Sequence, residues 1–236
     1  MKALIPALLA PAILLAGCSS ISINPQYQLS PETDWVANSP EWISEAESVY
    51  AEATEFVRTQ GSVRPAGSWA VIMDIDETVL NNVAYQLRLD RSGDAYSSES
   101  WYEWTQEEKA TLVPGSRAFI DAVRDSGGLV ALVTNRRDIE QLATETNLAK
   151  LGVYRGEDFQ VLLTRAEKAG DSDKQARFEL VEQMLAVQGY PDLEIVAFVG
   201  DNLGDRPANA QGSAFFCIDQ GAMYGDPCAA RPGSAR

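Results

Sequence analysis

From residue 69 onward, the sequence alternates short runs of β-branched and aliphatic residues with amphipathic stretches of helical period. This alternation predicts βαβ units, whose strands form a mostly parallel sheet. The apolar runs are continuous, which is typical of strands that helices cover on both faces. We therefore expect an α/β fold with a mostly parallel sheet between helices. The expected strands are 69–75, 129–134, 160–163, 194–199 and 213–218, and the expected helices are 116–125, 138–150 and 174–188.

Residues 79–113 interrupt this series and are rich in aromatic side chains. The segment is too long for a βα loop. We interpret it as a helical cap inserted over the strand ends of a core that spans residues 66–220, and we expect it to pack against the N-terminal helix. Residues 221–236 are expected to form a C-terminal tail.

Ser39-Pro40-Glu41 combines a helix N-cap, a first-turn proline and a first-turn acid, and apolar residues follow at helical spacing. The pattern predicts an N-terminal helical segment over residues 39–62 that Gly61 ends. Residues 18–38 lack periodicity and contain serine, asparagine and proline, so we expect a tether, with ordered structure starting near Ser39.

The N-terminus indicates export. Met1-Lys2 precedes the apolar residues 3–16, a stretch shorter than the roughly 20 residues of a membrane span. Leu15-Ala16-Gly17-Cys18 resembles the lipobox of bacterial lipoproteins, which implies a signal peptide over residues 1–17 and lipidation of Cys18; a plain cleaved signal is the alternative. Ser19 is compatible with an outer-membrane destination. We expect a lipid-anchored protein of the bacterial outer membrane or periplasm.

Cys217 and Cys228 are the other two cysteines, and an exported protein can pair them as a disulfide. Cys217 lies in the apolar run Ala214-Phe215-Phe216-Cys217-Ile218, so a buried small hydrophobic residue is the interpretation we favour slightly.

Charge and composition exclude several functions. The chain has 34 acidic and 19 basic residues, a net charge of −15, which argues against a polymeric nucleic acid as partner. It contains no histidine. That excludes histidine-ligated zinc, Ser-His-Asp and Cys-His catalysis and phosphohistidine chemistry. Acid–base chemistry is left to carboxylates, lysine or tyrosine.

Two strand ends carry carboxylates. Asp74 and Asp76 come directly after the apolar run 69–73, and residues two apart in an extended chain point the same way. Asp201 and Asp205 follow the strand at 194–199. If the two strands are neighbours, four carboxylates share one crevice, and such crowding requires protons or a cation. A hard divalent cation bound through oxygen fits best, which indicates Mg²⁺.

Thr134-Asn135 follows another strand, and Lys174 begins a helix. A hydroxyl, an amide, an ammonium group and a helix N-terminus all favour an anion, so these residues are candidate phosphate ligands. Lys168 is the alternative to Lys174 as the phosphate-binding lysine. We expect Arg177 to form a salt bridge on its helix rather than to bind phosphate. With the phosphate charge neutralised, Asp74 could attack phosphorus and form an aspartyl-phosphate.

Four segments together resemble the motifs of haloacid dehalogenase superfamily phosphatases, and the resemblance covers about residues 40–220. Within that superfamily, the sequence is most similar to the bacterial class C acid phosphatases. These are lipoprotein nonspecific acid phosphatases and 5′-nucleotidases with four signature aspartates. The segments are Asp74-Ile75-Asp76-Glu77-Thr78-Val79-Leu80, Val133-Thr134-Asn135-Arg136, Lys174-Gln175-Ala176-Arg177 and Gly200-Asp201-Asn202-Leu203-Gly204-Asp205.

The resemblance implies a haloacid dehalogenase-like fold, a Rossmann-like three-layer sandwich with a helical cap. It also implies a role for each matching residue. Asp74 would be nucleophile and metal ligand, and Asp76 the general acid/base and a metal ligand through its backbone carbonyl. Asp201 would be a further ligand of Mg²⁺, and Asp205 a supporting carboxylate. Thr134 and Lys174 would hold the phosphate. The implied function is Mg²⁺-dependent hydrolysis of small phosphomonoesters through an aspartyl-phosphate.

Nucleoside monophosphates and aryl phosphates are the expected substrates, and the oligomeric state is not predicted. Tyr85, Trp101, Trp104 and Tyr224 could stack on a base or aryl group, although the first three could equally form the core of the cap. A non-catalytic surface-binding lipoprotein with the same fold is the alternative function. A phosphoacceptor domain is a further rival, which export away from cytoplasmic kinases makes less favourable.

Overall fold

The computed structural model describes residues 28–166, 172–208, 210, 212–221, 223 and 228 of the 236-residue chain. The predicted signal peptide, Cys18, Lys168 and Tyr224 lie outside the described residues. Within the described part of the chain, no helix combines the length and apolarity needed to cross a membrane.

The central sheet has five strands in the order β5-β4-β1-β6-β7, and every neighbouring pair is parallel. The predicted α/β fold is confirmed, and each predicted strand is present within a few residues of its expected bounds. The strands are β1 Trp69–Met73, β4 Leu129–Arg137, β5 Val161–Arg165, β6 Glu194–Gly200 and β7 Ala214–Cys217.

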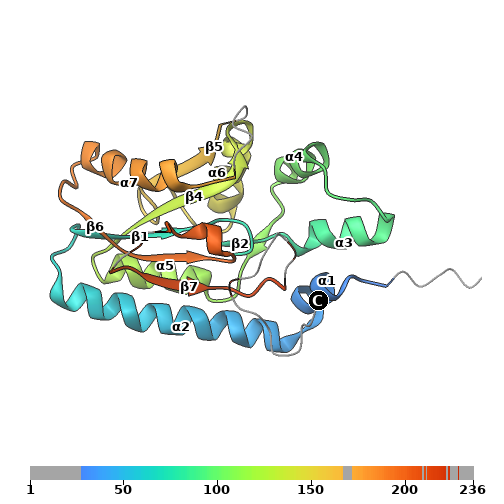
Figure 1. Ribbon diagram of the computed structural model, residues 1–236, viewed down its shortest axis with the longest axis horizontal. Helices are drawn as coiled ribbons and strands as arrows, with labels where there is room; N and C mark the ends of the chain where they lie inside the picture. The colour runs from blue at the N-terminus through green and yellow to red at the C-terminus, as the bar shows by residue number, and fades with distance from the viewer. Residues whose placement is uncertain are drawn as a thin grey trace, which may run out of the picture.

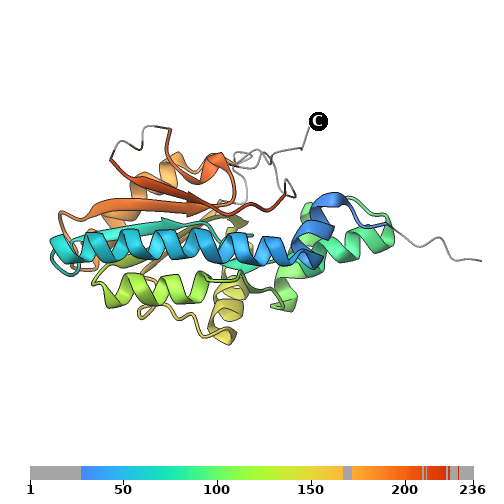
Figure 2. The same ribbon diagram turned by 90° about the horizontal axis from the view of Figure 1, so that it is seen from below.

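Helices cover both faces of the sheet (Figures 1 and 2). Val71 and Met73 of β1 belong to one apolar cluster, and Ala70 and Ile72 belong to a second. This follows from the two-residue period of a strand, which sends successive side chains to opposite faces. Helices α2, α5 and α6 contribute to the first cluster, and α7 contributes to the second. The helices are α2 Pro40–Val63, α5 Ser116–Asp125, α6 Gln141–Lys150, which follows the 3-10 turn Asp138–Glu140, and α7 Gln175–Val187.

The long helix α2 runs beside α5 along one face (Figure 2). Ser39 caps it as predicted, since its hydroxyl accepts a hydrogen bond from the Trp42 N–H. The predicted end at Gly61 is wrong, because α2 continues to Val63. A Cβ at Gly61 would collide with the carbonyl oxygen of Ser126, so this glycine permits the close approach of the chain that follows α5.

The predicted tether is wrong in its last third. Pro31–Asn38 forms helix α1, and the Ser30 hydroxyl accepts from the Thr33 N–H at its start. Thr33 and Val36 are buried, and α1 packs against α3 of the cap (Figures 1 and 2). A helix of only eight residues depends on such tertiary contacts, which its own sequence does not reveal.

The insertion after β1 forms two helices and a two-stranded antiparallel ribbon at the carboxyl end of the sheet (Figure 1). Ser97 and Ser100 form a capping box at the start of its second helix. Gly93, in the left-handed region with φ 73°, ends the first. These elements are β2 Leu80–Asn81, α3 Val83–Ser92, α4 Ser98–Glu107 and β3 Thr111–Leu112.

Cys217 and Cys228 form a disulfide, with Cα atoms 6.0 Å apart. The interpretation that we favoured, an unpaired buried Cys217, is wrong. Cys217 is the last residue of β7 and is only partly buried, so its thiol is accessible to the returning chain. The apolar run around Cys217 gave no sign that Cys228 lies beside it.

Candidate active site

Asp74 lies directly after β1 at the carboxyl edge of the sheet. Its N–H donates to the Val199 carbonyl at 2.9 Å, which ties it to the neighbouring strand β6. Asp201 and Asp205 follow β6, and carboxylate oxygens of Asp74, Asp201 and Asp205 lie within 4.8 Å of one another. All three side chains are buried. The structure therefore brings together the carboxylates predicted from two separate strands.

Lys174 lies among these carboxylates. It is buried at the start of α7, and its Nζ contacts Asp74 and donates to Asp205 Oδ1 at 2.7 Å. Burial alone would lower the pKa of Lys174, but Asp74 and Asp205 outweigh it and raise the pKa. The lysine therefore stays charged beside Asp74.

Asp205 supports the loop that carries Asp201. Its Oδ2 accepts the N–H groups of Asp201 and Asn202, each at 3.0 Å, while its Oδ1 is paired with Lys174. A Cβ at Gly200 would collide with the Asp205 side chain, so only glycine allows this packing. Both carboxylate oxygens of Asp205 are therefore engaged by other groups of the protein.

Asp201 has the contacts expected of a metal ligand. Its Oδ2 is buried and has no hydrogen-bond partner among the described residues. Burial raises the pKa of Asp201, and burial raises that of Asp74 to about 7, with Lys174 opposing the second shift. A divalent cation would satisfy the unpaired oxygen and favour both charged forms. The all-oxygen set of Asp74 and Asp201 therefore fits a hard divalent metal.

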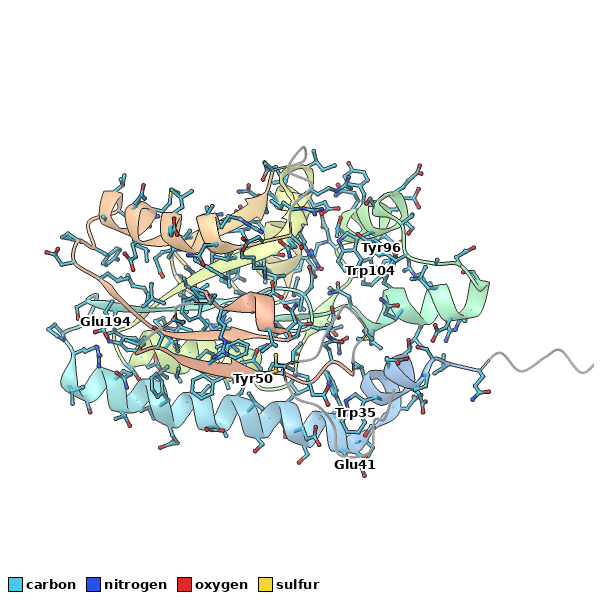
Figure 3. The ribbon with its side chains drawn as sticks, in the orientation of Figure 1. Trp35, Glu41, Tyr50, Tyr96, Trp104 and Glu194 are labelled. Carbon is cyan, nitrogen blue, oxygen red and sulfur yellow. A yellow bond between two sulfur atoms is a disulfide. The ribbon has the colours of Figure 1, made fainter. Side chains whose placement is uncertain are left out.

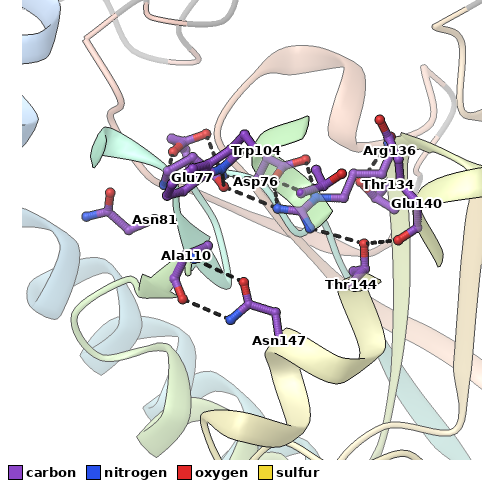
Figure 4. Close-up of polar contacts among 12 residues, drawn as sticks. Asp76, Glu77, Asn81, Trp104, Ala110, Thr134, Arg136, Glu140, Thr144 and Asn147 are labelled. Carbon is purple, nitrogen blue, oxygen red and sulfur yellow. Dashed lines mark hydrogen bonds and ion pairs between the residues drawn. The ribbon is translucent and has the colours of Figure 1, made fainter. Parts of the chain in front are cut away.

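Arg136 holds Asp76, a contact that the sequence analysis missed. The guanidinium is only 2% exposed and donates from Nη2 to Asp76 Oδ1 at 2.7 Å and from Nε to Asp76 Oδ1 at 3.0 Å (Figure 4). Asn82 adds a third contact to the same carboxylate at 2.8 Å. Arg136 belongs to the quoted motif Val133-Thr134-Asn135-Arg136, so its place in the motif was the available signal.

Thr134 and Asn135 lie at the end of β4, where the register with β5 shifts. Thr134 is fully buried and its Oγ1 accepts the Arg136 N–H at 3.1 Å, whereas Asn135 lines a cavity. The salt bridge predicted for Arg177 is wrong. Its Nη1 donates to the Thr134 carbonyl and its Nη2 to Asn135 Oδ1 at 2.6 Å, so it holds the strand end through neutral acceptors.

Helix α2 supports the loop after β1 from below. Tyr50 points from α2 into the core, and its hydroxyl donates to the Thr78 carbonyl at 2.7 Å (Figure 3). Burial raises the pKa of Tyr50 above its usual value, so the hydroxyl keeps its proton. Glu77, with φ 56°, turns inward and accepts the Asn82 N–H at 2.7 Å. These contacts fix the backbone that presents Asp74 and Asp76.

A cavity of about 550 Å³ opens between the strand ends and the cap. Asp74, Asp76 and Lys174 lie on its sheet side, and Tyr96 and Trp101 lie on its cap side.

The cap aromatics divide into two groups. Tyr85 and Trp104 are buried and do not line the cavity; the Trp104 Nε1 donates to Asn82 Oδ1 at 2.9 Å (Figures 3 and 4). They are core residues of the cap, so the stacking suggested for them is wrong. Trp101 reaches the cavity, as does Tyr96, which our list of stacking candidates omitted.

A family profile described as HAD superfamily, subfamily IIIB (acid phosphatase) matches residues 18–227. The chain belongs to this family. The match spans the sheet, the cap and all four motifs.

Similar solved structures agree with subfamily IIIB. The class C acid phosphatase of Bacillus anthracis has a TM-score of 0.66 and 25% identity, with 82% of this chain and 84% of that chain covered. The same enzyme with tungstate bound gives a TM-score of 0.65 at 22% identity, with the same coverage.

A curated relative, the stem 28 kDa glycoprotein of Glycine max, is 23% identical over 143 residues, 61% of this chain and 54% of the relative. The chain spans about half the length of the curated relatives it matches.

Proposed function

We propose that this protein is a Mg²⁺-dependent phosphomonoester hydrolase of the acid phosphatase or 5′-nucleotidase type that acts through an aspartyl-phosphate. One observation carries the proposal: Asp74, Asp76 and Lys174 line the same cavity, and buried Asp201 lies beside Asp74 with an unsatisfied oxygen. Membership of an acid phosphatase subfamily supports it. So does the similar B. anthracis enzyme, which binds tungstate, a tetrahedral oxyanion like phosphate.

The proposed reaction has two steps. An oxygen of Asp74 forms a bond to phosphorus while the ester oxygen leaves, and Asp76 donates the proton that the leaving oxygen takes up. Asp76 then accepts a proton from a water molecule that attacks the same phosphorus. The bond from Asp74 to phosphorus breaks, and inorganic phosphate leaves.

The remaining residues hold the phosphoryl group and the carboxylates. Lys174 and Asn135 line the cavity and would bind the phosphoryl oxygens that do not react. Thr134, buried at the same strand end as Asn135, would complete this set, and Arg136 keeps Asp76 aimed at the cavity. Mg²⁺ held by Asp74, Asp201 and the Asp76 backbone carbonyl would neutralise phosphoryl charge. Tyr96 and Trp101 would contact an aryl group or nucleobase. Small phosphomonoesters, including nucleoside monophosphates and aryl phosphates, are the proposed substrates.

The test is steady-state hydrolysis of p-nitrophenyl phosphate with Mg²⁺ and with a chelator, in the parent chain and in Asp74→Asn. We expect the variant to lose at least about 10³-fold in kcat, because no other group can form the covalent intermediate. Equal rates for variant and parent would exclude the mechanism. No hydrolysis of any phosphomonoester would favour the non-catalytic lipoprotein, and a lasting phosphoaspartate would favour the phosphoacceptor domain.

We also propose that the protein is exported and anchored through lipid on Cys18, at the bacterial outer membrane or periplasm. The lipobox-like Leu15-Ala16-Gly17-Cys18 supports this location, and so does the disulfide between Cys217 and Cys228, which an oxidising compartment favours. Metabolic labelling with a fatty acid should mark the parent and not Cys18→Ser. Labelling of both proteins, or of neither, would contradict the anchor.

A further inference from the structure

Basic residues on the sheet side of the cavity differ in what they hold. Arg136, Arg137, Arg165 and Lys174 line the cavity. Three of them already form ion pairs with carboxylates of the same site. In the described part of the chain, Arg165 forms no ion pair, and its buried Nε has no hydrogen-bond partner. A buried polar atom without a partner is costly, so this guanidinium is suited to an external anion.

Arg165 lies to one side of the expected phosphoryl position. It ends β5, where it is paired in register with Arg137 of β4, and β1 with Asp74 is the next strand beyond. Neighbouring strands are about 4.8 Å apart, so the backbones of β5 and β1 are separated by roughly 10 Å. A short ligand whose phosphoryl group reaches Asp74 could therefore also reach Arg165.

A second arginine strengthens the positive charge at this edge. Among the described residues, Arg177 donates to neutral acceptors alone, two main-chain carbonyls and an asparagine side chain. Burial lowers the pKa of Arg177, and the nearby Arg165 lowers it further. On the opposite wall, Asp90 and Asp94 of the cap line the cavity. Any second negative charge on a ligand is thus attracted to the β5 side and repelled from the cap side.

We propose that Arg165 binds a second anionic group, a carboxylate or another phosphate, on the phosphomonoester whose phosphoryl group lies at Asp74. The inference rests on the proposed function and narrows its substrate class to phosphomonoesters with an additional anion. A guanidinium is suited to this task, because it can donate two parallel hydrogen bonds to a carboxylate or phosphate.

The experiment compares kcat/KM for 3-carboxyphenyl phosphate, its methyl ester and 1,3-phenylene bisphosphate. The parent should prefer one or both of the charged substrates over the neutral ester, and the better one identifies the anion. Arg165→Gln should reduce that preference roughly tenfold or more, because a hydrogen bond to a charged group is lost. Arg165→Lys should retain part of it. Arg58→Gln, at an exposed arginine of α2 paired with Glu55, is the matched control and should leave all three values unchanged.

Two results would overturn the proposal: a parent without preference for either charged substrate, or a loss in Arg165→Gln that is equal for all three substrates. If the parent hydrolyses none of them, the proposed function fails while the binding site can still be tested. Calorimetry with 3-carboxyphenylphosphonate and phenylphosphonate would then compare the parent with Arg165→Gln. Equal affinity of the two phosphonates for the parent would refute the site without turnover.

Discussion

The two walls of the cavity are built in different ways. On the sheet wall, Asp74, Asp201 and Lys174 lie at the ends of strands or at the start of a helix, and buried hydrogen bonds fix them. On the cap wall, Tyr96 is 55% exposed and Trp101 belongs to a helix of ten residues. An exposed pair, Arg88 with Glu107, joins the two cap helices.

The difference suggests separate tasks for the two walls: catalysis on the sheet wall and substrate selection on the cap wall. In the proposed function, charges that act on phosphorus need fixed positions, and the sheet would supply them. The cap rings Tyr96 and Trp101 would contact the rest of the substrate. Arg136 connects the two walls, because it comes from β4, pairs with Asp76 and lies 5.7 Å from the centre of the Trp101 ring. Substitutions on the sheet wall should therefore affect catalysis more than those on the cap.

Among substitutions that leave the carboxylates and Lys174 in place, the largest effect should come from Gly200→Ala. The new methyl group would displace Asp205, which holds both Lys174 and the Asp201 loop, so we expect kcat/KM to fall by about 10²-fold or more. Gly93→Ala on the cap is the control. Nothing lies within 4 Å of its Cβ position, and its positive φ should cost only about 1 kcal/mol of stability. Similar activity losses in the two variants would refute the contrast between the walls.

Arg136→Met should have the next largest effect, because it removes the two guanidinium hydrogen bonds that hold the Asp76 carboxylate. We expect kcat/KM to fall by roughly 10- to 100-fold for an alkyl phosphate, whose leaving oxygen needs a proton, and by less for p-nitrophenyl phosphate. Arg136→Lys should recover part of the loss. An equal loss for both substrates would show that Arg136 supports the fold rather than the position of Asp76.

Trp101→Ala should affect KM more than kcat. We expect KM for a nucleoside monophosphate or aryl phosphate to rise by roughly tenfold, as one stacking contact is lost, with a smaller change for a short alkyl phosphate. Phe56→Ala, at a ring that contacts Phe216 away from the cavity, is the comparison. A uniform rise of KM for all substrates would exclude stacking by Trp101.

The smallest effect concerns Glu107. Its hydrogen bond with Arg88 and, to a smaller extent, its hydrogen bond with Lys109 lower the pKa of Glu107 to about 2. Since the folded pKa is below the unfolded value of about 4.3, the pair stabilises the cap above pH 4.3, and this contribution is lost as the pH falls towards 2. Solvent exposure should limit it to under about 1 kcal/mol. Thermal unfolding from pH 2 to 6 should show the difference between the parent and Glu107→Gln shrinking at low pH; a constant difference would contradict it.

Residues at strand ends could be predicted well from sequence. Continuous apolar runs locate β1 and β6, and polar side chains that follow parallel strands must meet at one edge. Asp74, Asp201 and Lys174 come together for that reason.

Contacts that depend on tertiary geometry could not be predicted. The fork between Arg136 and Asp76 joins residues 60 apart and depends on the local register shift at the end of β4. Helix α1 forms where its few apolar residues meet the cap, and Gly61 stays helical because another segment packs on it. A single sequence contains no signal for an approach by a distant segment.

The packing of α1 on the cap has a consequence for orientation. The described chain begins at residue 28, close to the cap end of the molecule (Figures 1 and 2). Residue 28 is ten positions after Cys18 (28 − 18 = 10), and even a fully extended chain of that length spans at most about 36 Å. With lipid on Cys18, the cap would be the end of the molecule held nearest the bilayer. Substrates would then be drawn from the thin aqueous layer beside the headgroups, where the acidic surface of the protein and an anionic leaflet would repel each other.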